Sequence, residues 1–133
     1  MKKYLLDTNI CIYFLKGQFN IDKKLKSVGV ENCFISEITV AELKFGAENS
    51  VQKEKNRKVI ENFIDSIQIL PIISCLDTYA KEKARLRKKG LTIDEFDLLI
   101  GSSSIENNMV LVTRNVKHFS RLKNCTIENW VDK

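Results

Sequence analysis

A short apolar run that stops on a carboxylate is the feature that most constrains this chain. Residues 4–6, Tyr-Leu-Leu, precede Asp7, and Thr8 and Asn9 follow. Apolar runs without polar alternation are typical of a central parallel strand covered by helices on both faces. Ligands of open parallel sheets bind beyond the carboxyl ends of the strands, which is where Asp7 would lie. Taken alone, the pattern favours an N-cap for a helix beginning near Ile10; the other carboxylates of the chain reverse that preference.

Apolar segments alternate with helix patterns along the whole chain. We expect further strands at residues 33–36, 68–71, 109–113 and 126–129, with Pro71 placing the second of these at an edge of the sheet. Helices are expected at residues 10–16, 22–28, 38–47, 53–66, 77–89, 92–105 and 116–119. This alternation predicts one α/β domain over residues 1–133, with a mostly parallel sheet of about five short strands between two layers of helices.

Glu42 lies inside a strongly apolar helix pattern. Six of the ten residues 38–47 are apolar, which predicts a helix buried on more than one side. A lone buried carboxylate costs several kcal/mol unless it is paired or bound to a metal. In the alternative, the helix is turned so that Glu42 and Lys44 reach solvent.

Asp97 is a third carboxylate in an apolar setting. Thr92 and Glu95 form a capping-box pattern with Thr92 as the N-cap, and capping also accounts for Asp94. It does not account for Asp97, which Leu-Leu-Ile follows in the helix. We therefore expect Asp97 to point inward with its neighbours.

The topology brings these acids to one edge of the sheet. Asp7 and the polar residues 113–115 end strands there, while the helices with Glu42 and Asp97 begin there or pass close by. Two like charges about 4 Å apart repel by about 4 kcal/mol at an effective dielectric constant of 20, so the cluster requires a counter-charge. With oxygen ligands only, Mg²⁺ is the fitting ion, with Mn²⁺ an alternative. Such an ion can activate water and stabilise charge on a phosphoryl group.

The charge balance points to a polyanionic partner. Lysines and arginines number 22 against 17 acids, a formal charge of +5 with a pI near 9.0. Arg114, Lys117, His118 and Arg121 follow the last polar strand end, and they are either phosphate contacts or incidental charges on a surface turn. The basic run at 85–89 is explained equally by RNA binding and by the negative end of a helix.

Cysteine usage and the amino terminus both favour a cytoplasmic protein that does not enter a membrane. Cys11, Cys33, Cys75 and Cys125 are widely spaced beside apolar segments, which favours reduced, buried thiols over zinc or disulfides. A nucleophilic pair of Cys11 with His118 rests on no motif. No apolar stretch approaches the roughly 18 residues of a membrane span, and an acid interrupts the amino terminus before a signal-type region develops.

Four motifs together resemble the PIN-domain ribonucleases, above all the VapC toxins of bacterial toxin–antitoxin pairs. They are Asp-Thr-Asn at 7–9, Glu42 within Thr-Val-Ala-Glu-Leu, Asp97 within Phe-Asp-Leu-Leu-Ile, and Val-Thr-Arg-Asn at 112–115 followed by His118 and Phe119. The resemblance covers nearly the whole chain, in matching order and spacing, and it implies a PIN-like three-layer α/β/α sandwich.

The resemblance also implies an activity and partners. The chain would be a Mg²⁺-dependent endoribonuclease that cuts structured RNA, notably transfer RNA, and inhibits translation. Asp7, Glu42 and Asp97 would form the acidic core, supported by the hydroxyls of Thr8 and Thr113. Asn115 falls where many relatives carry a fourth aspartate, which leaves a second metal site open. The family further implies a homodimer and a cognate VapB-type antitoxin, through which operator DNA is bound.

Two other interpretations stay open at this point. One is a Mg²⁺-binding signalling module of the receiver type, which is also small and acid-pocketed. It needs a phosphoacceptor aspartate at the end of a middle strand, and residues 33–36 and 68–71 offer none. The other is a PIN-like domain that binds RNA or protein without cutting.

Overall fold

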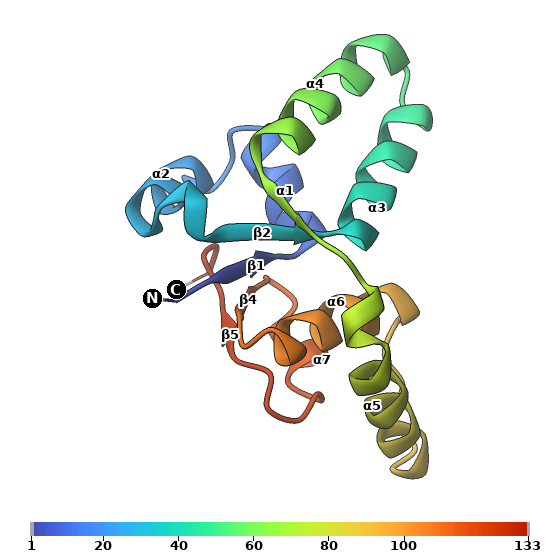
Figure 1. The fold of residues 1–133 in the computed structure, drawn as a ribbon. Coiled ribbons are helices and arrows are strands. Elements are labelled where there is room, and N and C mark those ends of the chain that lie inside the picture. The colour runs from blue at the N-terminus through green and yellow to red at the C-terminus, as the bar shows by residue number, and fades with distance from the viewer. Residues whose placement is uncertain (1, 133) are drawn as a thin grey trace.

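Five short strands form one parallel sheet at the centre of the computed structural model, which describes residues 2–132 (Figure 1). They are β1 (Tyr4–Leu6), β2 (Cys33–Ser36), β3 (Gln68–Leu70), β4 (Val110–Val112) and β5 (Ile127–Glu128). Their order is β3-β2-β1-β4-β5, and every neighbouring pair is parallel. The predicted central position of the first strand and edge position of the third are both confirmed.

Helices cover both faces of this sheet and complete the predicted α/β/α sandwich. On one face lie α1 (Thr8–Leu15), α2 (Ile21–Val28), α3 (Glu37–Glu48) and α4 (Lys53–Ser66), and on the other α5 (Leu76–Lys88), α6 (Glu95–Glu106) and α7 (Val116–Phe119) (Figure 1). Single turns of 3-10 helix at Val30–Asn32 and Ile73–Cys75 join these elements.

Side chains of the central strands alternate between two hydrophobic cores. Leu6 and Val112 pack with the helices of the first layer, whereas Leu5 and Leu111 pack with those of the second. Because successive side chains of a strand point to opposite faces, a strand covered on both faces must be apolar throughout. This explains why β1 and β4 show no polar alternation, and why their first polar residues appear only where the strands end.

The burial of α3 differs from the prediction. Thr39, Leu43 and Ala47 form one buried stripe at four-residue spacing, while Phe45 is 68% exposed. Ile38 and Val40 in the first turn are half-buried against different cores, so the predicted burial on more than one side holds for that turn and is wrong for the rest of the helix. The helix packs chiefly against α4, and its opposite side faces an open pocket. In α4 the buried residues are Ile60 and Phe63.

Two helix starts also differ from the prediction. Helix α1 begins at Thr8, directly after its N-cap Asp7, rather than near Ile10. Helix α6 begins at Glu95 with Asp94 as its N-cap, so the predicted cap at Thr92 was wrong. The Asp94 carboxylate accepts hydrogen bonds from the backbone N–H groups of residues 96 and 97, which leaves no place for a capping box begun two residues earlier.

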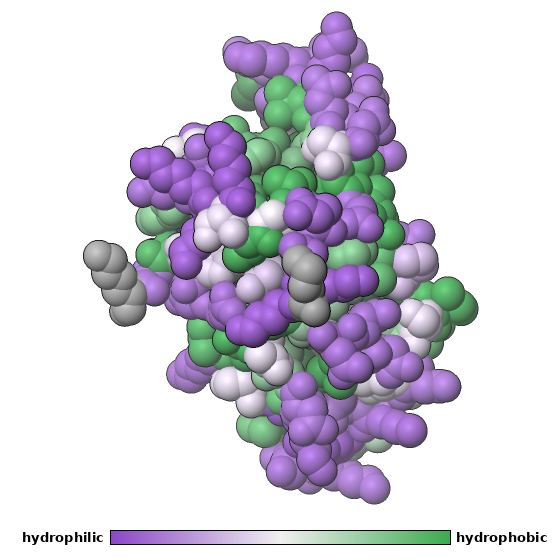
Figure 2. Space-filling view, turned by 60° about the vertical axis from the view of Figure 1, so that its left-hand side comes forward, coloured by the Kyte–Doolittle hydropathy of each residue, from purple (hydrophilic) through white to green (hydrophobic). Residues whose placement is uncertain are grey.

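The surface is polar where the molecule projects furthest. In Figure 2 hydrophilic side chains cover both tips, which correspond to the α3–α4 connection and the C-terminal end of α5. Among the described residues, no helix combines the length and the apolar character needed to cross a membrane.

Candidate active site

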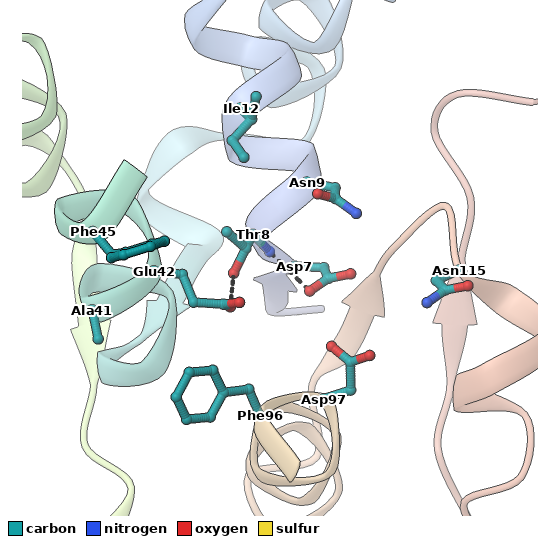
Figure 3. A pocket seen from close by; sticks show the side chains of 10 residues that line it. All are labelled: Asp7, Thr8, Asn9, Ile12, Ala41, Glu42, Phe45, Phe96, Asp97 and Asn115. Carbon is teal, nitrogen blue, oxygen red and sulfur yellow. Dashed lines mark hydrogen bonds between the residues drawn. The ribbon is translucent and has the colours of Figure 1, made fainter. Parts of the chain in front are cut away.

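A pocket of about 640 Å³ opens at the carboxyl edge of the sheet, between α1, α3 and α6 (Figure 3). It is lined by Asp7, Thr8, Asn9, Ile12, Ala41, Glu42, Phe45, Phe96, Asp97 and Asn115. The three carboxylates expected from the sequence therefore meet in one pocket, together with Asn115 and Thr8. Thr113 lies behind this lining and contacts Asp7.

Asp7 is both the N-cap of α1 and the deepest carboxylate of the pocket, with an exposed fraction of 4%. Its Oδ1 accepts the backbone N–H of Thr8 at 2.8 Å, and its Oδ2 accepts the hydroxyl of Thr113 at 2.8 Å. Burial raises the pKa of Asp7, the two hydrogen bonds oppose that rise, and the charge of Glu42 adds to it. The sequence left open whether Asp7 caps a helix or belongs to the acidic pocket, and in the structure it does both.

Glu42 is oriented by a chain of two hydroxyls. The Thr8 hydroxyl donates to its Oε1 at 2.6 Å, and the hydroxyl oxygens of Thr8 and Thr39 lie 3.0 Å apart. Since the Thr8 proton is used toward Glu42, Thr39 must donate to Thr8. Sequence reasoning missed Thr39, although its position one helical turn before Glu42 is a signal for a shared face. The alternative in which Glu42 and Lys44 both reach solvent holds for Lys44, which is exposed, but not for Glu42, which is half-buried and lines the pocket.

Asp97 lies in the first turn of α6 and faces the other two carboxylates (Figure 3). Burial raises its pKa to about 7, and the charges of Asp7, Asp94 and Glu42 add to this rise. Burial is thus the largest cause of the rise, and repulsion within the acid cluster acts in the same direction. The positive end of the α6 dipole offsets only a part of the rise.

Thr113 connects the end of β4 to both Asp7 and Asn115. While its hydroxyl donates to Asp7, the same oxygen accepts the backbone N–H of Asn115 at 2.9 Å. The backbone N–H of Asp7 in turn donates to the carbonyl oxygen of Val112 at 2.9 Å. The Asn115 side chain lies across the pocket from Glu42 (Figure 3). These bonds fix the two strand ends relative to each other.

The chemistry of the donors fits a hard divalent cation. Within residues 2–132, no three histidine, cysteine, aspartate or glutamate side chains come close enough together to hold an ion by themselves. Three mutually repelling carboxylates and an amide oxygen nevertheless form an oxygen-only set around an open pocket, as Mg²⁺ or Mn²⁺ prefers, with water completing the coordination. Such an ion would relieve the repulsion that adds to burial in raising the pKa of Asp97.

The basic residues expected to contact phosphate lie outside the pocket lining. Arg114 forms an ion pair with Asp132 at 3.2 Å, donates to the Tyr13 hydroxyl and stacks on the Phe19 ring. Arg121 donates to the carbonyl oxygen of Thr92. Lys117 is exposed, and within the described chain it has neither an ion-pair partner nor a side-chain hydrogen bond; His118 is half-buried. Their part in binding RNA stays a prediction.

The cysteines take no part in the pocket. All four are free, and Cys11 is completely buried. Burial raises the pKa of the Cys11 thiol far above its ordinary value, with the charge of Asp7 adding to the rise. A buried thiol of this kind is unreactive, so the Cys11 and His118 nucleophile pair is ruled out.

Comparison with known proteins gives consistent matches over nearly the whole chain. Residues 4–124 match the family model of the PIN domain. The chain is 38% identical to the ribonuclease VapC2 of Rickettsia felis, over 96% of this chain and 97% of that protein. It is 31% identical to the tRNA(fMet)-specific endonuclease VapC of Salmonella typhimurium, over 98% of this chain and 99% of that protein. The crystal structure of VapBC2 from Rickettsia felis bound to a promoter DNA fragment matches with a TM-score of 0.88 and 37% identity, over 96% of this chain and 98% of that one.

Proposed function

This chain belongs to the PIN-domain family, and from its likeness to the VapC ribonucleases we propose that it is the endoribonuclease toxin of a toxin–antitoxin pair. The observation that carries the proposal is the meeting of Asp7, Glu42 and Asp97 in one open pocket at the carboxyl edge of the sheet. An acid cluster on a chain of net charge +5 suits a reaction in which carboxylates bind a cation and the basic surface binds the phosphate backbone.

Each pocket residue has a defined part in phosphodiester hydrolysis. Asp7, Glu42 and Asp97 would bind Mg²⁺, which when bound supplies an activated water and stabilises the charge developing on phosphate. Thr113 fixes the direction of the Asp7 carboxylate and opposes the rise in its pKa, and Thr8 fixes the direction of Glu42. The Asn115 amide, neutral and across the pocket, orients water or a phosphate oxygen.

The proposed substrate and partners come from the relatives. One relative is named as a tRNA(fMet)-specific endonuclease, and solved relatives are VapBC complexes, two of them bound to DNA. We therefore assign structured RNA, above all transfer RNA, as the substrate, with inhibition of translation as the result. A VapB-type antitoxin would neutralise the chain and carry the contact with operator DNA, the toxin itself acting as a cytoplasmic homodimer. The family assignment sets aside the receiver-type interpretation.

Cleavage of a total transfer-RNA pool tests this function. Antitoxin-free protein with Mg²⁺ is expected to yield discrete fragments, and chelation should abolish them. Asp97→Asn, which removes the charge at almost constant volume, should lower the cleavage rate at least about 100-fold. Ile73→Ala serves as the matched control, because Ile73 is 74% exposed and lies outside the pocket.

Two results would contradict the proposal. Equal cutting by Asp97→Asn would identify a contaminating nuclease. No cutting by any antitoxin-free sample would favour a PIN-like domain that binds without cleaving.

A further inference from the structure

Two exposed phenylalanines lie on one side of the acidic pocket. Phe45 is 68% exposed and Phe96 44% exposed, and both belong to the pocket lining. Phe45 follows Glu42 by three residues on α3, and Phe96 directly precedes Asp97 on α6. In Figure 3 the two rings lie on the Glu42 side of the pocket, away from Asn115. We call this pair the aromatic wall.

The packing of the fold does not account for the aromatic wall. The buried stripe of α3 consists of Thr39, Leu43 and Ala47, and Phe45 lies outside it. A large apolar side chain left in water gives up the free energy that burial would provide. Scattered exposed apolar residues are ordinary on protein surfaces. Here, however, two of them come from separate helices to the same pocket, each within one helical turn of a carboxylate.

From this geometry we propose that the aromatic wall stacks a nucleobase next to the phosphodiester that is cut. This inference rests on the proposed nuclease function and names its substrate class. A base and its phosphate are joined through one sugar, so a base adjoining the phosphate at Glu42 and Asp97 falls beside these rings. Aromatic side chains bind the faces of bases with little regard to sequence.

Stacking on the wall requires a base with a free face. In a duplex both faces are covered by neighbouring pairs, whereas loops and bulges present bases that can be splayed out onto aromatic side chains. The aromatic wall therefore selects unpaired segments of structured RNA. We expect cuts in loops and none within helical stems.

The acidic surroundings favour RNA over a protein segment as the occupant. The rings line the same pocket as three carboxylates, Asp7, Glu42 and Asp97. An apolar protein side chain would cover the rings but leave the negative charge of the carboxylates uncompensated. A nucleotide would cover the rings with its base, and the cation bound with its phosphate would neutralise the carboxylates.

A cycle of variants and substrates tests the stacking directly. The substrate is a short RNA containing one site cut by the wild type, made intact or with a single abasic nucleotide on either side of the cut. With intact RNA, Phe45→Leu and Phe96→Leu should each lower kcat/KM about tenfold. One abasic position should cause a similar loss in the wild type. On that abasic RNA the leucine variants should lose little more, because the stacking partner is already gone.

The controls separate stacking from general damage. Leucine keeps the apolar volume, so the unfolding temperature should stay constant. Phe45→Tyr, which keeps the ring face, should restore cleavage. Ile73→Ala, which removes exposed apolar surface elsewhere, should not alter kcat/KM for either RNA.

Each contrary outcome has a distinct meaning. Fully additive losses, or unchanged cleavage by both leucine variants, overturn the aromatic wall as a base site while the nuclease function stands. Unchanged cleavage with weakened antitoxin binding makes the wall a protein-docking surface.

If the wild type cuts no RNA, the proposed function fails. The aromatic wall is then tested by the binding, in chelator, of the same RNA carrying 2-aminopurine beside the site. Fluorescence quenching lost in the leucine variants supports stacking, and equal quenching or none overturns it.

Discussion

The hydroxyl of Thr113 acts on both the charge and the direction of Asp7, the most buried of the three proposed metal ligands. Thr113 is completely buried, donates to Asp7 and accepts from the backbone of Asn115. Burial favours the protonated form of Asp7, and the hydrogen bond from Thr113 is the largest influence opposing it. A single side chain directly after β4 therefore influences the charge and fixes the direction of the proposed ligand at the end of β1.

Thr113→Val tests this role at nearly constant volume. Without the hydroxyl the pKa of Asp7 should rise further, and the affinity for Mg²⁺ should fall about 10- to 100-fold, as is typical when the partner of a metal ligand is removed. Thr113→Ser keeps the hydroxyl and should stay close to the wild type. Titration of Mn²⁺ by calorimetry, with the Mg²⁺ dependence of cleavage, measures the effect. Equal ion affinity in the valine and serine variants would show that packing alone matters at this position.

At the scale of elements, a partly buried ion pair between Glu82 and Arg85 holds the segment after α7 against α5. Glu82, 8% exposed, accepts two hydrogen bonds from Arg85 and one from the backbone N–H of Lys123. Arg85 also donates to the carbonyl oxygen of Arg121, whose own guanidinium donates to that of Thr92. These contacts tie α5 to the segment that leads into α6, the helix that carries the third carboxylate of the site.

This pair gives stability a defined dependence on pH. The hydrogen bonds from Arg85 lower the pKa of Glu82 below its ordinary value of about 4.5. Its contribution is therefore fully present above that value and is lost as pH falls through the folded-state pKa. Glu82→Gln should lower the free energy of unfolding by about 2 kcal/mol at pH 7, and the difference from wild type should shrink in more acidic solution.

Urea unfolding at neutral and acidic pH measures this difference. Asp65→Asn is the control, since Asp65 is exposed on α4 and has no side-chain hydrogen bond or ion pair within the described residues. A difference between Glu82→Gln and wild type that stays constant with pH would show that the ionised pair is not the source of the stability.

The elements themselves could be predicted because their signals are local. Apolar runs without alternation indicated the covered strands, and the parallel order placed Asp7 beside residues 113–115. The exposure of Phe45 could not be predicted, because composition tells how apolar α3 is but not which side α4 covers. The ion pair of Arg114 could not be predicted either, because Tyr13 and Asp132 are distant in the sequence and only the tertiary fold brings them to Arg114.

On the scale of the whole molecule, charge is divided between an acidic pocket and a basic exterior. The net charge is +5 although the pocket collects three carboxylates. In the proposed function, phosphate contacts of such an exterior would provide affinity and orientation for RNA, while the pocket would provide the chemistry. The ion pair of Arg114 with Asp132 lowers the contribution to RNA affinity that we expect from Arg114, because the guanidinium must leave Asp132 before it can bind phosphate.

Salt dependence of RNA binding tests this division. For single strands, log K falls with log salt by about 0.7 for each phosphate neutralised. In chelator, which prevents cleavage, the double variant Arg114→Gln with Lys117→Gln should bind RNA more weakly and with a flatter slope. Lys117→Gln alone should account for most of this change, because Lys117 is exposed and without an ion-pair partner in the described part of the chain. Asp132→Asn should strengthen binding, since it releases Arg114 toward the RNA. A slope that stays the same in the double variant would remove both residues from the RNA-binding surface and leave the basic end of α5 as the place to look for it.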